Sequence, residues 1–272
     1  QAGKAALENA GVNPEEIDLL VVATITPDTS MPSTACYVQP KLGLINATCF
    51  DISAACSGFV YALDIARQYI LTGAAKKVMV IGAEKMSALL DWQDRGTCVI
   101  FGDGDGAVIL EEGTGTSRGI VSSAMGSDGK LASLIRVDAG GSSLPASLDT
   151  VNNRQHFLKM EGNQVFKSAV RGMSEIADQA LKMAGLSAAD IACVVPHQAN
   201  IRIISAIAEK MSIPMENVVI NLDRFGNTTA ASIPLALEEA VRSGRIKNGD
   251  YFLIVAFGAG LTWGASVIQW GR

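Results

Sequence analysis

Two stretches decide the fold: Ala6-Leu7-Glu8-Asn9-Ala10-Gly11, which Ile17 and Val21 follow, and Ala180-Leu181-Lys182-Met183-Ala184-Gly185, which Ile191 and Val195 follow. The second stretch repeats the first with the same internal spacing, so that Gly185 matches Gly11 and Val195 matches Val21. Each copy predicts a helix that ends at a glycine, then a short loop and a buried strand. We therefore expect the chain to consist of two copies of one α/β unit.

Short β-branched runs alternate with longer helical patterns along the rest of the chain. This alternation is typical of a mostly parallel sheet that helices cover. The predicted fold class is therefore α/β, with helices in most of the gaps. The predicted strands are residues 19–23, 78–82, 99–101 with 107–110, 193–196, 218–221 and 252–257.

A second correspondence sets Cys56 against Asn227, and a helix that ends near a glycine (Gly73, Gly244) follows each. Residues 113–155 lie between the copies, are rich in Gly, Ser, Asp and Asn, and lack strong helical periodicity. We predict a first half over residues 1–112, a linker and surface excursion over 113–155, and a second half over 156–272.

Composition excludes several classes of protein. Of the 272 residues, 49% are hydrophobic and 18% are charged, and the net charge is -5. This balance permits a large core and argues against a nucleic-acid partner, which needs clustered Lys and Arg. The longest apolar runs are well short of the roughly 20 residues that span a bilayer, so no transmembrane helix is expected.

Five cysteines are widely spaced without a C-x-x-C pair, which predicts neither a disulfide framework nor a zinc site and fits a reducing cytoplasm. The run Gly102-Asp103-Gly104-Asp105-Gly106 matches neither an EF-hand nor a phosphate-binding loop, so we expect a structural turn and no metal.

Cys56 is the candidate nucleophile. It stands before an apolar helical pattern that begins near Phe59, and a helix N-terminus favours the thiolate. We interpret the other cysteines as small buried residues.

Two histidines and one asparagine complete the set of candidates. His197 follows a predicted strand, at the sheet edge where α/β sites form. His156 lies in the polar excursion and is expected to be solvated. Asn227 could equally be a helix cap, and Phe257-Gly258-Ala259-Gly260-Leu261-Thr262-Trp263-Gly264 could be an ordinary tight turn or a place where a backbone N–H approaches a ligand.

Four motifs occur in a recognisable order: Ala55-Cys56-Ser57-Gly58, Pro196-His197-Gln198-Ala199-Asn200, Gly226-Asn227-Thr228-Thr229-Ala230-Ala231-Ser232 and the glycine turn after Phe257. Together they resemble the β-ketoacyl-acyl-carrier-protein synthase III family. The resemblance runs nearly end to end, but the chain begins within the first repeat's helix. Relative to the family we therefore expect an N-terminal truncation that removes the opening strand and the CoA-adenine clamp, or a real loss of part of the CoA site.

The resemblance implies a thiolase-like fold with layers in the order α-β-α-β-α, and a condensing acyltransferase that needs no cofactor. Cys56 would take an acyl group from acyl-CoA, the backbone N–H groups of Cys56 and Ala259 would hold the oxyanion, and His197 and Asn227 would stabilise the enolate from malonyl-acyl carrier protein. The family is dimeric. The remaining implied positions are Arg95, Phe166 and Asn200 on the CoA and pantetheine path, Lys167, Arg202 and Lys210 in a carrier-protein patch, and Met31 in the partner's acyl pocket.

Alternatives remain open at this point. A relative of the same fold could serve polyketide or alkylquinolone assembly, or transfer acyl groups without condensation. A non-catalytic partner subunit would be expected to lose the nucleophile. A cysteine hydrolase would also use Cys, His and Asn, but would have no need for a duplicated architecture.

Overall fold

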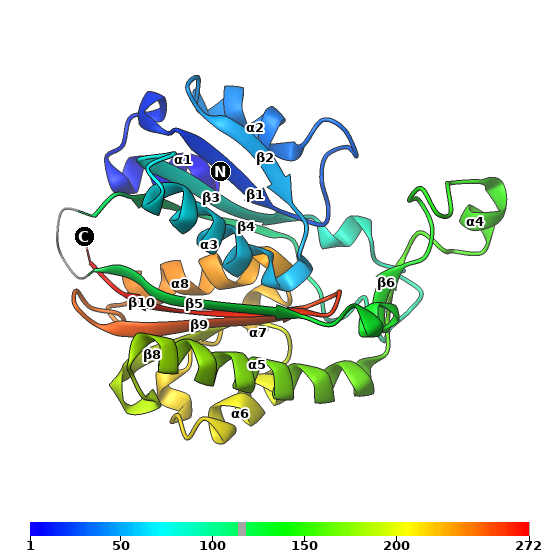
Figure 1. Ribbon diagram of the computed structural model, residues 1–272. Coiled ribbons are helices and arrows are strands. Elements are labelled where there is room, and N and C mark those ends of the chain that lie inside the picture. Colours follow the sequence, from blue (N-terminus) through cyan, green and yellow to red (C-terminus); the bar gives the residue numbers. More distant parts are fainter. Residues whose placement is uncertain (114–117, 272) are drawn as a thin grey trace.

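Two four-stranded sheets lie at the centre of the computed structural model, which describes residues 1–113 and 118–271 (Figure 1). The strand order is β2-β1-β3-β4 in the first sheet and β5-β10-β9-β8 in the second. Their bounds are β1 (Leu19–Ala23), β2 (Thr48–Ile52), β3 (Lys77–Glu84), β4 (Gly104–Glu111), β5 (Gly119–Ser127), β8 (Ile191–Pro196), β9 (Tyr251–Gly258) and β10 (Thr262–Gln269).

The sheets are mixed. In the first sheet β1 pairs in parallel with β2 and β3, and β4 is antiparallel to β3. In the second sheet only β8 and β9 are parallel, while β10 is antiparallel to both β9 and β5. The expectation of mostly parallel pairing is therefore wrong for the second sheet, because a short turn joins β9 directly to β10.

Helices form three layers around the sheets, which confirms the thiolase-like order of layers (Figure 1). Helices α3 (Gly58–Leu71) and α8 (Ser232–Arg242) lie between the sheets. Helices α1 (Ala2–Ala10) and α2 (Thr34–Leu42) cover the outer face of the first sheet, and α5 (Gly162–Ala184) and α6 (Ile201–Lys210) cover that of the second.

The central core explains why α3 is apolar on almost every side. Its residues Phe59, Val60 and Ala62 are fully buried, and they belong to one cluster with strand residues of both sheets. A helix between two sheets has no solvent face, so apolar residues are needed all round it. At about 25 cal/mol per Å² of apolar surface, this burial is a main source of stability.

The duplication that the repeat predicts is visible in the backbone. Gly11 and Gly185 end α1 and α5 in the left-handed conformation, with φ of 64° and 69°. The turn η2 (Ala55–Ser57) precedes α3, and the turn η7 (Thr229–Ala231) precedes α8, with the same spacing between the two turns as between these two glycines.

The proposed match of Cys56 with Asn227 is wrong. In the structure Cys56 corresponds to Ala230, because Ala55 and Thr229 share an unusual positive φ, 47° and 46°. Helix α3 has 14 residues and α8 has 11. The sequence offset between Gly73 and Gly244, which follow these helices, is therefore shorter than the offset between η2 and η7, which precede them. Matching the two halves on those glycines therefore misaligns the starts of the helices.

Three further expectations need correction. Residues 99–101 form turns ending in an isolated bridge at Phe101, and of residues 218–221 only Val218 makes an isolated bridge. Residues 113–155 are not all linker, because residues 119–127 form the edge strand β5 of the second sheet.

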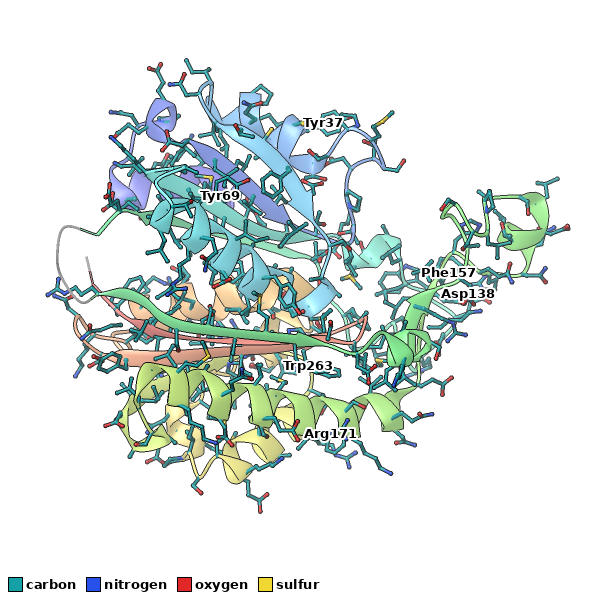
Figure 2. All side chains as sticks on the ribbon, viewed as in Figure 1. Tyr37, Tyr69, Asp138, Phe157, Arg171 and Trp263 are labelled. Carbon is teal, nitrogen blue, oxygen red and sulfur yellow. The ribbon has the colours of Figure 1, made fainter. Side chains whose placement is uncertain are left out.

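Residues 128–160 form a projection. Short strands β6 (Ile135–Val137) and β7 (Leu158–Met160) pair at its base, and α4 (Leu148–Asn152) lies at its tip (Figure 1). Asp138 and Phe157 lie on this projection (Figure 2). His156 is half-buried there and hydrogen-bonds Thr150 at 2.9 Å, so it is not simply solvated. No helix within the described residues is long and apolar enough to cross a membrane.

Candidate active site

Cys56 lies in η2, directly before α3. Ser57 donates to the Ala54 carbonyl at 2.8 Å, and the Thr262 hydroxyl lies 2.6 Å from the Ser57 hydroxyl. Gly258 approaches so closely that a Cβ there would stand 2.6 Å from the Cys56 nitrogen. The turn after β9 and the nucleophile turn are therefore in direct backbone contact, and only glycine permits it.

The Cys56 thiol does not have the low pKa that a helix N-terminus alone predicts. Burial, with a smaller contribution from the negative charge of Glu84, raises the pKa of Cys56 to about 12. Within residues 1–113 and 118–271, no cationic group offsets this rise. Burial therefore acts against the preference for thiolate that the helix N-terminus predicts.

His197 is a buried neutral imidazole at the end of β8. Its side chain is 2% exposed, and burial lowers its pKa to about 3. Its backbone N–H donates to the Val255 carbonyl at 2.8 Å, which continues the pairing of β8 with β9. Nδ1 lies 2.6 Å from the hydroxyl of Ser232, the first residue of α8. This contact leaves Nε2 as the nitrogen available to meet a substrate.

Asn227 is buried and its amide has a defined orientation. Its Oδ1 accepts from the Thr229 backbone N–H at 2.9 Å. The backbone of Asn227 is held between Ile100 and Gly102, to which it is bonded on both sides. Because Oδ1 is occupied, the side chain offers its NH₂ group as a donor.

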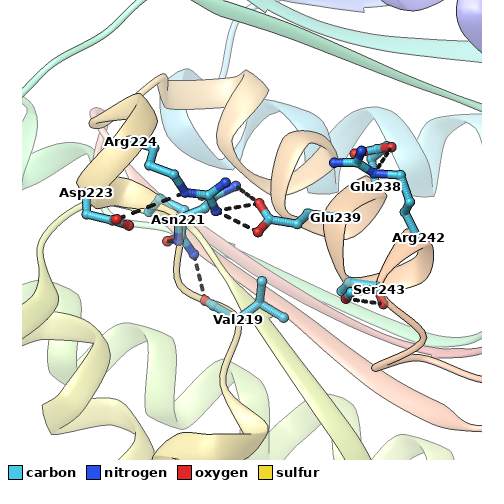
Figure 3. Close-up of polar contacts among 10 residues, drawn as sticks. Val219, Asn221, Asp223, Arg224, Glu238, Glu239, Arg242 and Ser243 are labelled. Carbon is cyan, nitrogen blue, oxygen red and sulfur yellow. Dashed lines mark hydrogen bonds and ion pairs between the residues drawn. The ribbon is translucent and has the colours of Figure 1, made fainter.

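The short helix α7 (Leu222–Phe225) lies directly before the Asn227 turn and is tied to α8. Arg224 on α7 donates to both carboxylate oxygens of Glu239 on α8, at 2.6 and 2.7 Å (Figure 3). On the other side, a Cβ at Gly102 would clash with the Phe225 carbonyl at 2.1 Å. The expectation that residues 102–106 form a turn is wrong for most of the run, because Gly104, Asp105 and Gly106 already belong to β4. Gly102 lies just before the strand and permits this close approach.

The two elements η7 and α8 connect the three candidate residues. Asn227 is bonded to Thr229 in η7, His197 to Ser232 at the start of α8, and η7 packs directly against the η2 turn of Cys56. One thiol and two uncharged donors therefore share one region between the two halves. Such a set suits covalent acyl transfer with stabilisation of a developing oxyanion.

The outer positions that the resemblance implies lie at the surface or serve other contacts. Asn200 caps α6 by accepting from the Arg202 N–H at 2.8 Å. The Arg202 guanidinium lies over the Phe166 ring, 5.6 Å from its centre. The turn after β9 contains Ala259, which follows Gly258. Exposed side chains are those of Arg95, Lys167, Arg202, Lys210 and Met31, the last 84% exposed.

Sequence reasoning missed three residues that shape the site: Glu84, Thr229 and Ser232. Glu84 ends β3 with a buried carboxyl, and the other two hold Asn227 and His197. Ser232 and Thr229 stand in the same motif as Asn227, but their partners are set by tertiary contacts. The one available signal for Glu84 was an acidic residue at the end of an apolar strand.

Fold and site together define a condensing acyltransferase of the thiolase type. The family model described as "3-Oxoacyl-[acyl-carrier-protein (ACP)] synthase III" matches residues 50–129. The model of the C-terminal part of the same family matches residues 181–270. A β-ketoacyl-acyl-carrier-protein synthase III of Clostridioides difficile is 53% identical over 99% of this chain and 82% of its own length.

Solved structures agree. The 3-oxoacyl-acyl-carrier-protein synthase III of Aquifex aeolicus has a TM-score of 0.92 at 47% identity, over 99% of this chain and 82% of that one. A priming β-ketosynthase of a polyketide pathway has a TM-score of 0.90 at 36% identity, over 100% and 80%. The chain belongs to the β-ketoacyl-acyl-carrier-protein synthase III family and is a condensing acyltransferase of fatty acid synthesis.

Proposed function

We propose that Cys56, His197 and Asn227 carry out a two-stage condensation that joins an acyl group from acyl-CoA to malonyl-acyl carrier protein. In the first stage the Cys56 sulfur attacks the acyl-CoA thioester and CoA leaves. The backbone N–H groups of Cys56 and Ala259 hold the oxyanion, a role supported by the close contact of Gly258 with the Cys56 nitrogen.

In the second stage malonyl-acyl carrier protein binds with its thioester carbonyl toward His197 and Asn227. Decarboxylation places negative charge on that carbonyl oxygen, and two uncharged donors stabilise it without taking up a proton. The resulting carbanion attacks the Cys56 thioester, so that the β-ketoacyl product forms on the carrier protein and the Cys56 sulfur leaves as a thiolate. A proton from solvent then regenerates the thiol.

The observation that carries this proposal is the hydrogen bonding behind the two donors. Thr229 occupies Oδ1 of Asn227, so the side-chain NH₂ is free to donate to substrate. Ser232 meets Nδ1 of His197, and in the tautomer in which Nδ1 accepts from this hydroxyl, Nε2 carries the proton and donates to substrate. The low pKa of His197, about 3, keeps it neutral at physiological pH. A protease-like role for His197 as a strong base is disfavoured by the same burial.

The carrier protein is proposed to dock on the exposed cations Lys167, Arg202 and Lys210, on α5 and α6. These helices pack together, so the three charges can face one acidic partner. Arg95, Phe166 and Asn200 are proposed to line the path of CoA and pantetheine. The proposed reaction uses no metal or organic cofactor.

A homodimer is proposed because Met31 is 84% exposed in the single chain, which suits a side chain that enters a partner's acyl pocket. A cytoplasmic location is proposed because the five cysteines are all free thiols.

The test is to incubate the protein with acyl-CoA and malonyl-acyl carrier protein and to identify the product by mass spectrometry. We expect β-ketoacyl-carrier protein together with carbon dioxide. Charge reversal of the surface patch, Lys210→Glu, should raise KM for the carrier protein and leave acylation by acyl-CoA unchanged. Glu209→Lys, its exposed neighbour, is the matched control. Free acid without a condensed product would contradict the proposal and favour a hydrolase.

A further inference from the structure

Two free thiols lie in contact on the outer side of the first sheet. Cys36 belongs to the first turn of α2, and Cys49 lies on the edge strand β2. Their sulfur atoms are 3.7 Å apart. Cys36 is exposed and Cys49 is partly buried, so the expectation of a buried cysteine is wrong for Cys36. Neither thiol has a part in the two-stage condensation.

The backbones that carry these two thiols are already held together. Asp51 follows Cys49 by two residues and therefore lies on the same face of β2. It accepts from the N–H groups of Thr34 and Ala35 at 2.6 and 2.8 Å, immediately before Cys36. A disulfide has a sulfur–sulfur distance of about 2.05 Å, so rotation of two short side chains can close the remaining gap.

The surroundings of the pair favour a disulfide over a metal site. The Ser33 hydroxyl donates to the Cys36 sulfur at 3.2 Å, and the Cys49 thiol donates to Oε1 of Gln39 at 3.6 Å. Both carboxylate oxygens of Asp51 are occupied by the start of α2. Across residues 1–113 and 118–271, no group of three or more His, Cys, Asp or Glu side chains could hold a metal ion. Two thiols in contact, without a third ligand, are suited to reversible oxidation.

The two thiols have different access to a reagent from solvent. Cys36 is exposed, so an oxidant can reach its sulfur directly. Burial, followed by the hydrogen bond with Cys36, raises the pKa of Cys49 to about 11. Cys49 is therefore the poorer thiol to start the reaction, and its contact with Cys36 places it to complete the reaction.

We propose that Cys36 and Cys49 form a reversible redox pair: an external disulfide reacts first with exposed Cys36, and Cys49 then closes an intramolecular disulfide that ties α2 to β2. In a reducing compartment such disulfides are transient and report a change in redox conditions. Neither Cys56 nor the condensation takes part in this chemistry, so the pair is a modification site separate from the candidate active site.

The oxidation balances with oxidised glutathione as the external disulfide. The Cys36 thiolate attacks one glutathione sulfur, a mixed disulfide forms, and the other glutathione leaves as a thiolate. The Cys49 thiolate then attacks the Cys36 sulfur and releases the second glutathione. Two protein thiols are oxidised, one glutathione disulfide is reduced to two thiols, and the two protein thiol protons end on the glutathione sulfurs.

The disulfide also acts on the segment that carries Met31. This segment is attached to α2, because the Thr29 hydroxyl lies 3.4 Å from the hydroxyl of Tyr37 on α2 (Figure 2). Joining Cys36 to Cys49 closes a loop of about 14 residues, which includes most of α2. The unfolded chain then has fewer conformations, so thermal unfolding of the oxidised form moves to higher temperature.

The experiment oxidises the whole protein with excess oxidised glutathione and counts free thiols by alkylation in denaturant and intact mass. We expect three of the five cysteines to remain free, and a peptide map in which Cys36 is joined to Cys49. Dithiothreitol should restore all five thiols. The Tm of the oxidised form should be higher than that of the reduced form by on the order of 5 °C.

Single substitutions separate the two thiols. Cys36→Ser and Cys49→Ser should each abolish the disulfide and the Tm shift, and Cys49→Ser should retain a glutathione adduct on Cys36. Cys98→Ser leaves the pair in place and should oxidise as the wild type does, so it is the matched control. Five free thiols after oxidation, a lasting glutathione adduct on wild-type Cys36, or a disulfide to another cysteine or between two copies of the chain would overturn the proposal. An unchanged or lower Tm of the oxidised form would also overturn it.

Discussion

The two turns η2 and η7 have the same backbone and different tasks. Each begins with a residue at positive φ, Ala55 at 47° and Thr229 at 46°, and each leads into a helix between the sheets. In the first half the next residue is Cys56, and in the second it is Ala230, which is 1% exposed. One half thus supplies the nucleophile, and the other holds His197 and Asn227 through Ser232 and Thr229.

The duplicated backbone alone does not make a reactive site. Gly258 packs closely against the Cys56 nitrogen, and Ala230 lies against Gly58 and Gly82. Cys56 keeps partial exposure, whereas Ala230 is 1% exposed, so the second turn offers no side chain that a substrate can reach. A substitution that exchanges the two side chains, or that forces the turns apart, therefore tests this division of roles.

The largest effect is expected from moving the thiol to the other turn. Cys56→Ala should abolish condensation, with a loss on the order of 10⁶-fold as for other covalent nucleophiles. Adding Ala230→Cys to that variant should not restore activity, because position 230 is buried and no acyl donor reaches it. Condensation rates of the single and double variants measure this. Recovery in the double variant would contradict the assigned roles, and Cys193→Ala serves as the control.

The second half should affect decarboxylation more than acylation. Asn227→Ala removes one donor to the enolate oxygen and should lower malonyl decarboxylation by roughly 10²- to 10³-fold. Acylation of Cys56 by acyl-CoA should proceed as in the wild type. Carbon dioxide release and intact mass separate the two steps, and equal losses in both would show that Asn227 serves the whole site.

Contact between the turns should be sensitive to one methyl group. Gly82→Ala places a Cβ 2.4 Å from the Ala230 carbonyl and should destabilise the fold by about 3 kcal/mol. In Gly172→Ala the new Cβ would lie 3.5 Å from the Phe257 and Trp263 rings, which is an ordinary van der Waals distance. That helix-interior change should stabilise by about 0.5 to 1 kcal/mol. Urea unfolding of both variants gives the comparison, and similar values for the two would be inconsistent with a tight junction.

Acid should unfold the protein through the buried histidine. The pKa of His197 is about 6.5 when unfolded and falls to about 3 in the fold, so the unfolded chain takes up a proton that the folded chain refuses. Stability contributed by neutral His197 is present above pH 6.5 and is lost as pH falls toward 3, at up to about 1.4 kcal/mol per pH unit. His197→Asn should flatten this slope in urea unfolding across the pH range, and an unchanged slope in this variant would contradict the assignment.

Sequence predicted the fold where periodicity and glycine caps were strong. The strands β1 and β9 are buried on both faces and were expected, as was the helix α3 after Cys56. Strand β5 was missed because Gly119–Ser127 consists largely of small residues, and β2 because it is an edge strand with no fully buried residue. Edge strands are paired by tertiary contacts that no local pattern records.

The candidate triad could be named from motifs, but its electrostatics could not. The helix N-terminus suggested a thiolate at Cys56, and the pKa of about 12 follows from burial and from Glu84, which lies beyond α3 at the far end of the next strand. Ser232 and Thr229 likewise act through distances of 2.6 and 2.9 Å that depend on how the two halves meet.

The most direct test of the division between the two halves is the intact mass of the protein after incubation with a panel of acyl-CoAs, followed by peptide mapping. We expect a single acyl adduct, located on Cys56, absent from Cys56→Ala and removed by malonyl-acyl carrier protein. An adduct on another cysteine, or one that persists in Cys56→Ala, would contradict this division of roles.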